Sequence, residues 1–273
     1  MGDQVGLLVV KMGGAAGVDP EPLCDDVAAL VGQGTPLVLV HGGSHETDVI
    51  ARRLGKPPRH VTSISGHQSR YTDRETLEIF AMVTAGRINK LLVERLQRRG
   101  VRALGLSGVD GRLLEGKRKS SLKIVEDGKV KVLHDEWSGV VERVHAPLLL
   151  MLLNQGYLPV IAPLAISYAG EMLNVDGDRA AAAVAAALNA DTLILLTNVP
   201  GLLRAYPDES TLIPHISRAD IEGYFSCAQG RMKRKLLGAQ EALNGGVRQV
   251  ILADGRTASP IRQALMGKGT VVR

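Results

Sequence analysis

The stretch that decides the fold is residues 6–14, which read GLLVVKMGG. The aliphatic run predicts a short buried strand, and this strand delivers Lys11 to the mouth of two glycines. Glycines at the end of a strand allow backbone N–H groups to approach an anion closely. Residues 36–44, PLVLVHGGS, repeat the arrangement on a second strand. We therefore expect one crevice with two walls that hold anions.

Short aliphatic runs alternate with longer helical patterns along the chain. The pattern predicts strands at 6–11, 36–41, 101–106, 157–161, 191–196, 247–252 and 269–272, and helices at 20–33, 44–54, 74–99, 145–155, 176–189, 231–245 and 258–266. Such alternation is typical of an α/β fold, a three-layer αβα sandwich with a mainly parallel central sheet. Residues 112–142 break the rhythm and are predicted to form a β-hairpin insertion, and a second short hairpin is predicted at 164–174. A domain boundary is expected near Ala190, between residues 1–189 and 190–273.

Composition and charge exclude several classes of protein. Aromatic residues make up only 3% of the chain, so the core is expected to consist of Ala, Leu, Val and Ile. The net charge of +5 is concentrated in residues 112–131, which hold seven basic and three acidic residues. This basic stretch has no interleaved aromatic residues, which argues against binding of nucleic acid. Cys24 and Cys227 are far apart, and no run approaches the roughly 18 apolar residues of a membrane helix. A cytoplasmic protein without a membrane partner is expected.

Three further segments carry polar groups of the kind that chemistry requires. Residues 172–178, MLNVDGD, place three short polar side chains at the start of a helix, more than a helix cap needs. Residues 229–235, QGRMKRK, place four cations at a helix start, against the helix dipole. A polyphosphate site would require this charge, and a solvated basic face is the alternative. Residues 193–202, LILLTNVPGL, end a strand in a polar pair and a turn, where open α/β sheets bind ligands.

No metal held by the protein is predicted. His41 and His45 lie four residues apart, but the glutamate of a zinc-binding helix is missing between them. A turn residue and a helix-face residue are the better interpretation of this pair.

Taken in order, these motifs resemble the amino-acid kinase family, and within it the acetylglutamate-kinase-like branch, over essentially the whole chain. The motifs that carry the resemblance are Lys11-Met12-Gly13-Gly14, His41-Gly42-Gly43, Ser69-Arg70, Asn174 to Asp178, Leu196 to Gly201, and Gly230 to Lys235. The resemblance implies the amino-acid kinase fold, with residues 1–189 as the acyl-substrate lobe and 190–273 as the nucleotide-binding lobe. In that family the γ-phosphoryl group of ATP passes to a carboxylate, which gives an acyl phosphate.

The resemblance also implies the functions of individual residues. Lys11 and Lys235 correspond to the catalytic lysines that neutralise the transferring phosphoryl group, and Asp178 to the carboxylate that orients both. The implied substrate contacts are Gly43, Ser44, Arg70 and Asn174, and the implied nucleotide contacts are Gly13, Gly14, Thr197, Asn198, Val199 and Gly201. Mg²⁺ is expected to arrive bound to ATP, because no carboxylate cluster for a protein-held metal is visible.

One departure from the family pattern points to a narrower branch. Acetylglutamate kinases usually read His-Gly-Gly-Gly, where this chain has Ser44 at the last position. With residues 69–75, the basic insertion and residues 230–235, this is similar to the carrier-linked aminoadipate kinases of lysine biosynthesis. Their substrate is α-aminoadipate joined through its amino group to a small acidic amino-group carrier protein, LysW, and the kinase phosphorylates the distal carboxylate.

For this chain, the narrower resemblance implies carrier docking at Arg118, Lys119 and Lys123, and a homodimer formed through a helix of the first lobe. Two alternatives stay open. One is a kinase of N-acetylglutamate, or of carrier-linked glutamate, in arginine biosynthesis. The other is a non-catalytic nucleotide-binding sensor on the same fold.

Overall fold

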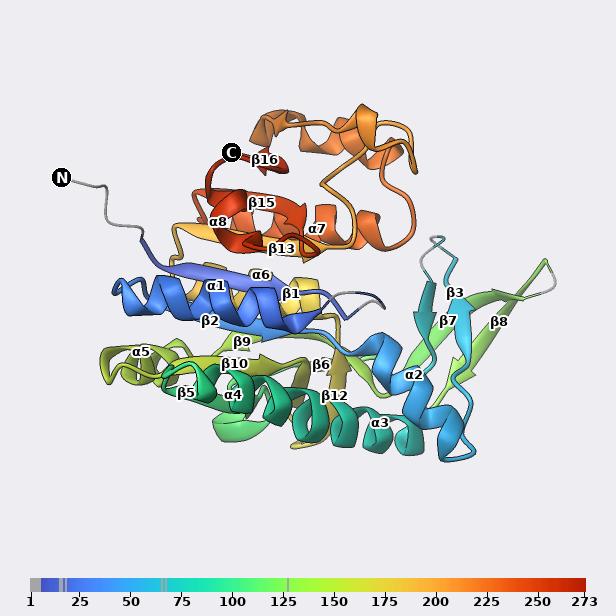
Figure 1. Cartoon of the computed structure of the whole chain (residues 1–273). Coiled ribbons are helices and arrows are strands. Elements are labelled where there is room, and N and C mark those ends of the chain that lie inside the picture. Colours follow the sequence, from blue (N-terminus) through green and yellow to red (C-terminus); the bar gives the residue numbers. More distant parts are fainter. Residues whose placement is uncertain (1–5, 15–16, 18, 65, 67, 127) are drawn as a thin grey trace.

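The computed structural model describes residues 6–14, 17, 19–64, 66, 68–126 and 128–273. Its centre is one eight-stranded sheet, in the order β14-β16-β15-β13-β1-β2-β10-β5 (Figure 1). Its strands are β1 (Leu8–Met12), β2 (Leu37–His41), β5 (Ala103–Ser107), β10 (Leu158–Ala162), β13 (Thr192–Thr197), β14 (His215–Ile216), β15 (Gln249–Asp254) and β16 (Thr270–Val272). All neighbours pair in parallel except β15 and β16, so the prediction of a mainly parallel sheet is confirmed.

Helices cover both faces of this sheet and complete the predicted three layers (Figure 1). On one face lie α5 (Ala146–Asn154), α6 (Gly177–Ala187) and α7 (Arg231–Asn244), and on the other lie α1 (Pro20–Gly32), α4 (Asn89–Arg98) and α8 (Pro260–Leu265). The remaining helical segments are α2 (Ser44–Arg53), α3 (Arg74–Ala81), the π-helical turn Met82–Ile88 that joins α3 to α4, and the 3₁₀ turns Asp110–Arg112, Glu209–Thr211 and Arg218–Ser226. Among the described residues, no helix is long and apolar enough to cross a membrane.

The sheet has one hydrophobic core on each face, and successive side chains along β1 point alternately into the two cores. Leu8 and Val10 are fully buried in the core beneath α1, α4 and α8, whereas Val9 is fully buried in the core beneath α6 and α7. Burial of each such side chain stabilises the fold by about 1.5–3 kcal/mol. Since side chains alternate with a period of two, Lys11 leaves the strand on the same side as Val9, toward α6.

The predicted hairpin insertion is present, and its base is part of a small barrel. Its tip is the predicted hairpin, formed by β7 (Ser121–Glu126) and β8 (Lys129–His134), but β6 (Leu114–Arg118) also pairs with β9 (Ser138–Val144). These outer strands close a small barrel with β11 (Leu164–Ser167) and β12 (Met172–Val175), which together form the second predicted hairpin. The prediction of a hairpin insertion over 112–142 is therefore confirmed, but local turn signals did not reveal that its outer strands also pair with strands far along the chain. Asp127, in the predicted turn, lies outside the described residues.

A further two-stranded sheet, β3 (His60–Thr62) with β4 (Gln68–Arg70), was not predicted. It stands beside the hairpin, because Ser63 bridges to Ile124 of β7 (Figure 1). The main sheet runs through both predicted lobes, since β13 pairs directly with β1. The division at Ala190 stays a prediction.

Candidate active site

Three of the predicted residues meet in one buried ionic centre, Lys11–Asp178–Lys235. The Lys11 Nζ lies 2.7 Å from Asp178 Oδ1. The Lys235 Nζ lies 3.0 Å from the same oxygen and 3.3 Å from Oδ2. All three residues are at most 7% exposed. One carboxylate thus holds two ammonium groups at the end of the central strand.

The start of α6 aims Asp178 at the lysines. Asp176 is the N-cap, and its Oδ1 accepts hydrogen bonds from the backbone N–H groups of Asp178 (2.9 Å) and Arg179 (3.1 Å). Because Asp176 does the capping, the carboxylate of Asp178 is available to the lysines. The sequence pattern of more polar groups than a cap needs therefore has a structural explanation.

Close packing of α7 on α6 brings Lys235 to the same carboxylate. A Cβ at Gly238 would lie 3.3 Å from the Asp178 carbonyl oxygen, and a Cβ at Gly245 would lie 2.5 Å from the Ala186 Cβ. Gly238 within α7 and Gly245 at its C-cap thus allow the two helices to approach closely. Lys235 lies one turn before Gly238 on α7. The close contact between the two helices therefore positions the Lys235 side chain beside Asp178.

Burial and mutual charge set the protonation states in the centre. Burial by itself would raise the pKa of Asp178, but the adjacent charges of Lys11 and Lys235 outweigh it and hold that pKa well below its usual range. Burial lowers the pKa of Lys235 to about 8, against the opposing effect of Asp178. Two cations and one anion leave a net positive charge that a transferring phosphoryl group can neutralise.

The two glycine turns pack directly on each other beside this centre. A Cβ at Gly14 would lie 2.2 Å from the Gly43 nitrogen, and a Cβ at Gly42 would lie 2.7 Å from the Gly14 nitrogen. Ser44 Oγ donates to the Gly14 carbonyl at 3.3 Å. Only glycine permits this contact of backbone on backbone. The predicted Gly13-Gly14 and Gly43-Ser44 contacts therefore lie in one continuous surface, without a gap between the turns.

The predicted substrate contact Arg70 already has partners within the fold. Its Nη2 lies 2.6 Å from Asp48 Oδ1 and donates to the Ser44 carbonyl at 2.8 Å. Asn174, on β12, donates from Nδ2 to Thr72 Oγ1 at 3.0 Å. Arg70 is thus linked to Ser44, and Asn174 to the segment that follows β4, but the charge of Arg70 is neutralised by Asp48.

The predicted nucleotide contacts lie at and beyond the end of β13, next to the end of β1. Thr197 is 7% exposed and its carbonyl accepts from Gly255 N–H at 2.7 Å. Asn198 is exposed and Val199 is half-buried. Gly201 is buried, and a Cβ there would lie 2.6 Å from Thr270 Oγ1. Packing against β16 therefore explains why a glycine stands at position 201, and a nucleotide contact is not needed to explain it.

The N-terminus of α7 faces the same end of the structure with a surplus of positive charge. Gly230, at φ +51°, is the N-cap residue and supplies no side chain to cap the helix. Arg231, Lys233 and Arg234 follow it, and Arg234 Nη1 lies 3.4 Å from Asp176 Oδ2. Uncapped N–H groups with cations beside them are suited to bind phosphate.

The three predicted docking residues differ in their surroundings. The Arg118 guanidinium carbon stacks 3.6 Å from the ring centre of Trp137, and its Nη1 lies 3.0 Å from Glu171 Oε1. Lys123 is exposed on β7. Lys119 lies in the turn between β6 and β7, and its backbone N–H donates to the Ser138 carbonyl at 2.9 Å.

Sequence reasoning missed a buried pair behind the glycine turns. His41 Nδ1 donates to the Gly42 carbonyl at 2.9 Å, and the Asn89 amide donates to His41 Nε2 at 3.2 Å and to the Val160 carbonyl at 2.9 Å. Both side chains are fully buried, and burial lowers the pKa of His41 to about 4. The neutral ring therefore anchors the Gly42-Gly43 turn. In the sequence, the one sign of this buried pair was the asparagine at position 89 in an otherwise amphipathic helix.

Among the residues that the structure describes, no three His, Cys, Asp or Glu side chains cluster in a way that could hold a metal ion.

Comparison with known proteins agrees with this geometry. Residues 6–254 match the model of the amino acid kinase family. The chain belongs to this family. A protein named LysW-aminoadipate kinase from Deinococcus radiodurans is 57% identical, over 98% of this chain and 92% of its own length. A Thermus thermophilus protein of the same name is 53% identical, over 98% of this chain and 100% of its own.

A solved structure extends the comparison. The Neisseria gonorrhoeae N-acetylglutamate synthase, complexed with coenzyme A and N-acetyl-glutamate, is 29% identical and superimposes with a TM-score of 0.78. The match covers 97% of this chain and 59% of that longer one. The predicted amino-acid kinase fold is thus confirmed.

Proposed function

We propose that this chain transfers the γ-phosphoryl group of ATP to the distal carboxylate of α-aminoadipate, carried on a small acidic LysW-like protein, and releases an acyl phosphate. The observation that carries the proposal is the buried Lys11–Asp178–Lys235 centre at the carboxyl end of the sheet. The names of the relatives at 57% and 53% identity support the choice of acceptor.

Phosphoryl transfer between two anions depends on positioning and charge, and the centre supplies both. The equatorial oxygens of the transferring group carry negative charge that cations must balance. Lys11 and Lys235 approach from two elements, β1 and α7, and Asp178 keeps their ammonium groups in place. Fixed charges in a site that excludes water stabilise the transition state without reorganisation.

The nucleotide would bring the metal. Mg²⁺ prefers oxygen ligands and is commonly held by substrate phosphates with few protein ligands. Bound in this way, it would neutralise charge on the phosphates. The N-terminus of α7 and the Gly13-Gly14 turn would hold the phosphate groups through backbone N–H groups.

The basic hairpin would steer the acidic carrier toward this site. Lys123 and Lys129 are exposed on β7 and β8, and neither has an ion pair among the described residues. Positive patches accelerate encounter with an acidic partner in a manner that depends on salt. Arg118 would contribute less, since Trp137 and Glu171 already engage it.

A homodimer is also proposed, as the family resemblance implies, through a helix of the first lobe. Support comes from Met82, which is 58% exposed on the α3–α4 helix, and from β5, the last strand of the sheet in this lobe. Analytical ultracentrifugation tests this: a mass of two chains is expected, and a monomer at micromolar concentration contradicts it.

The function is tested by trapping acyl phosphate with hydroxylamine in the presence of Mg²⁺ and ATP. Four acceptors are compared: carrier-linked aminoadipate, carrier-linked glutamate, free aminoadipate and free N-acetylglutamate. The proposal expects the highest kcat/KM with carrier-linked aminoadipate. Preference for free N-acetylglutamate would support the arginine-pathway alternative, and ATP binding without any turnover would support the sensor.

Docking is tested separately by a double variant, Lys123→Ala with Lys129→Ala. We expect a lower kcat/KM for the carrier-linked substrate at low salt and a smaller difference at high salt. Lys268→Ala, which removes an exposed lysine on the nucleotide lobe, is the matched control. An equal effect of both variants would contradict docking on the hairpin.

A further inference from the structure

The side-chain amide of Asn89 is held in one orientation by its neighbours. The Lys90 Nζ, which can only donate, lies 3.1 Å from Asn89 Oδ1. The carbonyl oxygens of Val160 and Leu106, which can only accept, lie 2.9 and 3.3 Å from Asn89 Nδ2. The group of Asn89 that faces His41 is therefore the NH₂ and not the carbonyl.

This orientation selects the tautomer of His41. Asn89 Nδ2 lies 3.2 Å from His41 Nε2, so Nε2 must accept and carries no proton. Burial, with the nearby charges of Lys11 and Lys90, lowers the pKa of His41 to about 4, so the ring is neutral at neutral pH. The single ring proton therefore lies on Nδ1, which donates to the Gly42 carbonyl at 2.9 Å.

The bond from His41 fixes the peptide group between Gly42 and Gly43. This peptide bond is trans. In a planar trans peptide the C=O and the N–H point in opposite directions. Because the Gly42 carbonyl faces the buried ring, the Gly43 N–H points away from the ring. It has no hydrogen-bond partner among the described residues.

The π-helical turn Met82–Ile88 packs against the same glycine. A Cβ at Gly43 would lie 2.7 Å from Ile88 Cδ1 and 2.8 Å from Thr84 Cγ2, which both belong to this turn. The turn ends directly before Asn89. π-Helical turns joined to α-helices are frequent at functional sites. Here one such turn brings two packing side chains and Asn89 behind the glycine turn.

The glycine turn also lies against the ionic centre. A Cβ at Gly177, the first residue of α6, would lie 3.4 Å from Lys11 Cε and 3.7 Å from the His41 carbonyl oxygen. The Gly43 nitrogen lies beside Gly14, where a Cβ would be 2.2 Å from it. The unpartnered N–H is therefore part of the surface next to the catalytic lysine.

We propose that His41 and Asn89 are positioning residues, which hold the Gly42-Gly43 peptide so that the Gly43 N–H donates to the carboxylate that is phosphorylated. The inference rests on the proposed function, in which Gly43 contacts the acceptor. Neither side chain touches the substrate, because both are fully buried and act through the backbone of the turn. A donor fixed in this way stabilises developing charge without reorganisation.

The test uses two amides of different length at position 41. In His41→Asn the NH₂ group can take the place of Nδ1 and still reach the Gly42 carbonyl, whereas in His41→Gln it takes the place of Nε2 and cannot. We measure kcat/KM with whichever of the four acceptors the wild type prefers, and the Tm and the Kd of ATP as controls for folding. His41→Gln is expected to lower kcat/KM about 10- to 100-fold with little change in the Kd of ATP. His41→Asn should recover most of that loss.

Asn89→Leu tests the second positioning residue. In the wild-type background this substitution frees the ring to carry its proton on Nε2, so kcat/KM should fall. In the His41→Asn background there is no tautomer to select, and the same substitution should cost less. Such non-additivity is the sign of residues that act together. Equal costs in the two backgrounds would overturn the role of Asn89.

NMR spectroscopy of the ring nitrogens tests the tautomer in the wild type, without reliance on a variant that must stay active. After labelling with ¹⁵N-histidine, the His41 signals are those missing from His41→Asn, and we expect the proton on Nδ1 at neutral pH. A proton on Nε2, or equal kcat/KM for His41→Gln and His41→Asn, would overturn the inference alone. Failure of the wild type to phosphorylate any of the four acceptors would overturn the proposed function instead, whatever the tautomer of His41.

Discussion

Two clusters of ion pairs lie on opposite faces of the sheet, with similar distances but different surroundings. In the Lys11–Asp178–Lys235 centre, beneath α6 and α7, the ion pairs measure 2.7 and 3.0 Å and the side chains are 8–9% exposed. The surface network between α1 and α4 has ion pairs of 2.6–2.7 Å. Its acidic member Glu21 has a side chain that is 41% exposed. Because the distances are similar, exposure to solvent, and not distance, decides how strongly the charges in each cluster interact.

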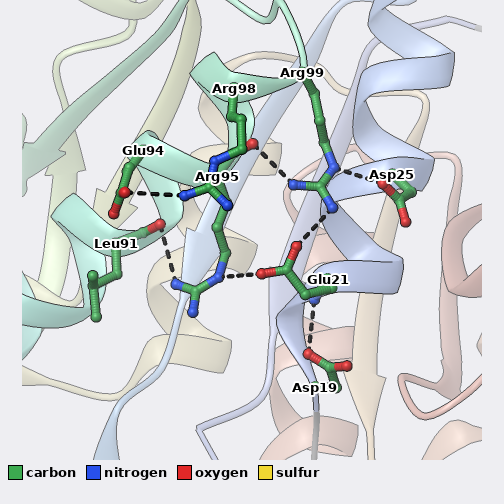
Figure 2. Close-up of polar contacts among 8 residues, drawn as sticks. All are labelled: Asp19, Glu21, Asp25, Leu91, Glu94, Arg95, Arg98 and Arg99. Atoms are coloured by element: carbon green, nitrogen blue, oxygen red, sulfur yellow. Dashed lines mark hydrogen bonds and ion pairs between the residues drawn. The ribbon is translucent and has the colours of Figure 1, made fainter.

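The surface network joins two helices (Figure 2). The Glu21 carboxylate lies between Arg95 and Arg99, and Arg99 also reaches Asp25 at 2.6 Å. Asp19 caps α1 by accepting from the Glu21 N–H at 3.0 Å. Water and salt screen these charges, so they contribute little to stability. The buried centre has no such screening.

The largest effect is expected from Lys235→Met. The variant removes one of the two cations that we propose face the transferring group, and we expect kcat to fall about 10²- to 10³-fold, as for loss of one transition-state donor. Lys11→Met should behave similarly. Hydroxylamine trapping measures the rate, and thermal melting confirms that the variant folds. A kcat within a factor of a few of the wild type would remove Lys235 from the mechanism.

The next largest effect is expected from Gly238→Val, which leaves every charge in place. A side chain there would press on the Asp178 backbone, so that α7 must shift and carry Lys235 with it. Misplacement of a catalytic group by about 1 Å can cost about 100-fold in rate. We expect kcat to fall about 10- to 100-fold. Gly223→Ala, at a glycine with open space around its Cβ position, is the control and should retain activity.

A smaller effect is expected from pH. In the proposed mechanism Lys235 must be protonated to stabilise the phosphoryl group, and burial lowers its pKa to about 8. Activity should therefore be retained below that pH and kcat/KM should fall as pH rises through about 8, approaching tenfold per unit. Lys235→Arg keeps its charge to higher pH, so its profile should lack this decline. A wild-type profile that stays flat up to pH 9.5 would contradict the assignment.

The smallest effect is expected from Glu21→Gln in the surface network. Acyl phosphate formation should be unchanged, and any change in Tm should vanish in about 1 M salt, where the Debye length is near 3 Å. A loss of activity in this variant would mean that the surface network contributes to the active site. This result would contradict the proposed difference between the two clusters.

The sequence predicted the parts of the site that depend on local pattern. Aliphatic runs define the strands, parallel strands meet at one edge, and Lys11 and Thr197 therefore had to lie at the same end of the sheet. The fold class and seven of the eight main-sheet strands followed from the same alternation, and only the two-residue strand β14 was missed. The identity of the three charged residues came from their resemblance to a family.

The parts of the fold and of the site that the sequence did not predict depend on contacts between residues far apart in the chain. Nothing near Arg70 in the sequence reveals that Asp48 neutralises it. Charge alone grouped Lys119 with Lys123, but the Lys119 N–H bonds Ser138 at the base of the insertion, whereas Lys123 lies on the hairpin strand β7. The three-residue strands β3 and β4 were too short to show a period. His41 resembled a turn residue until Asn89 was placed against it.

The decisive measurement is acyl phosphate formation by Asp178→Asn across a range of pH. If the buried Asp178 carboxylate holds both ammonium groups, its loss leaves the positive charges of Lys11 and Lys235 unbalanced in a buried site. We predict a fall in kcat of about 100-fold or more, and an alkaline decline that begins at lower pH, because Lys235 loses the charge that opposes its deprotonation. A folded Asp178→Asn variant with the kcat and pH profile of the wild type would contradict the proposed arrangement of the site.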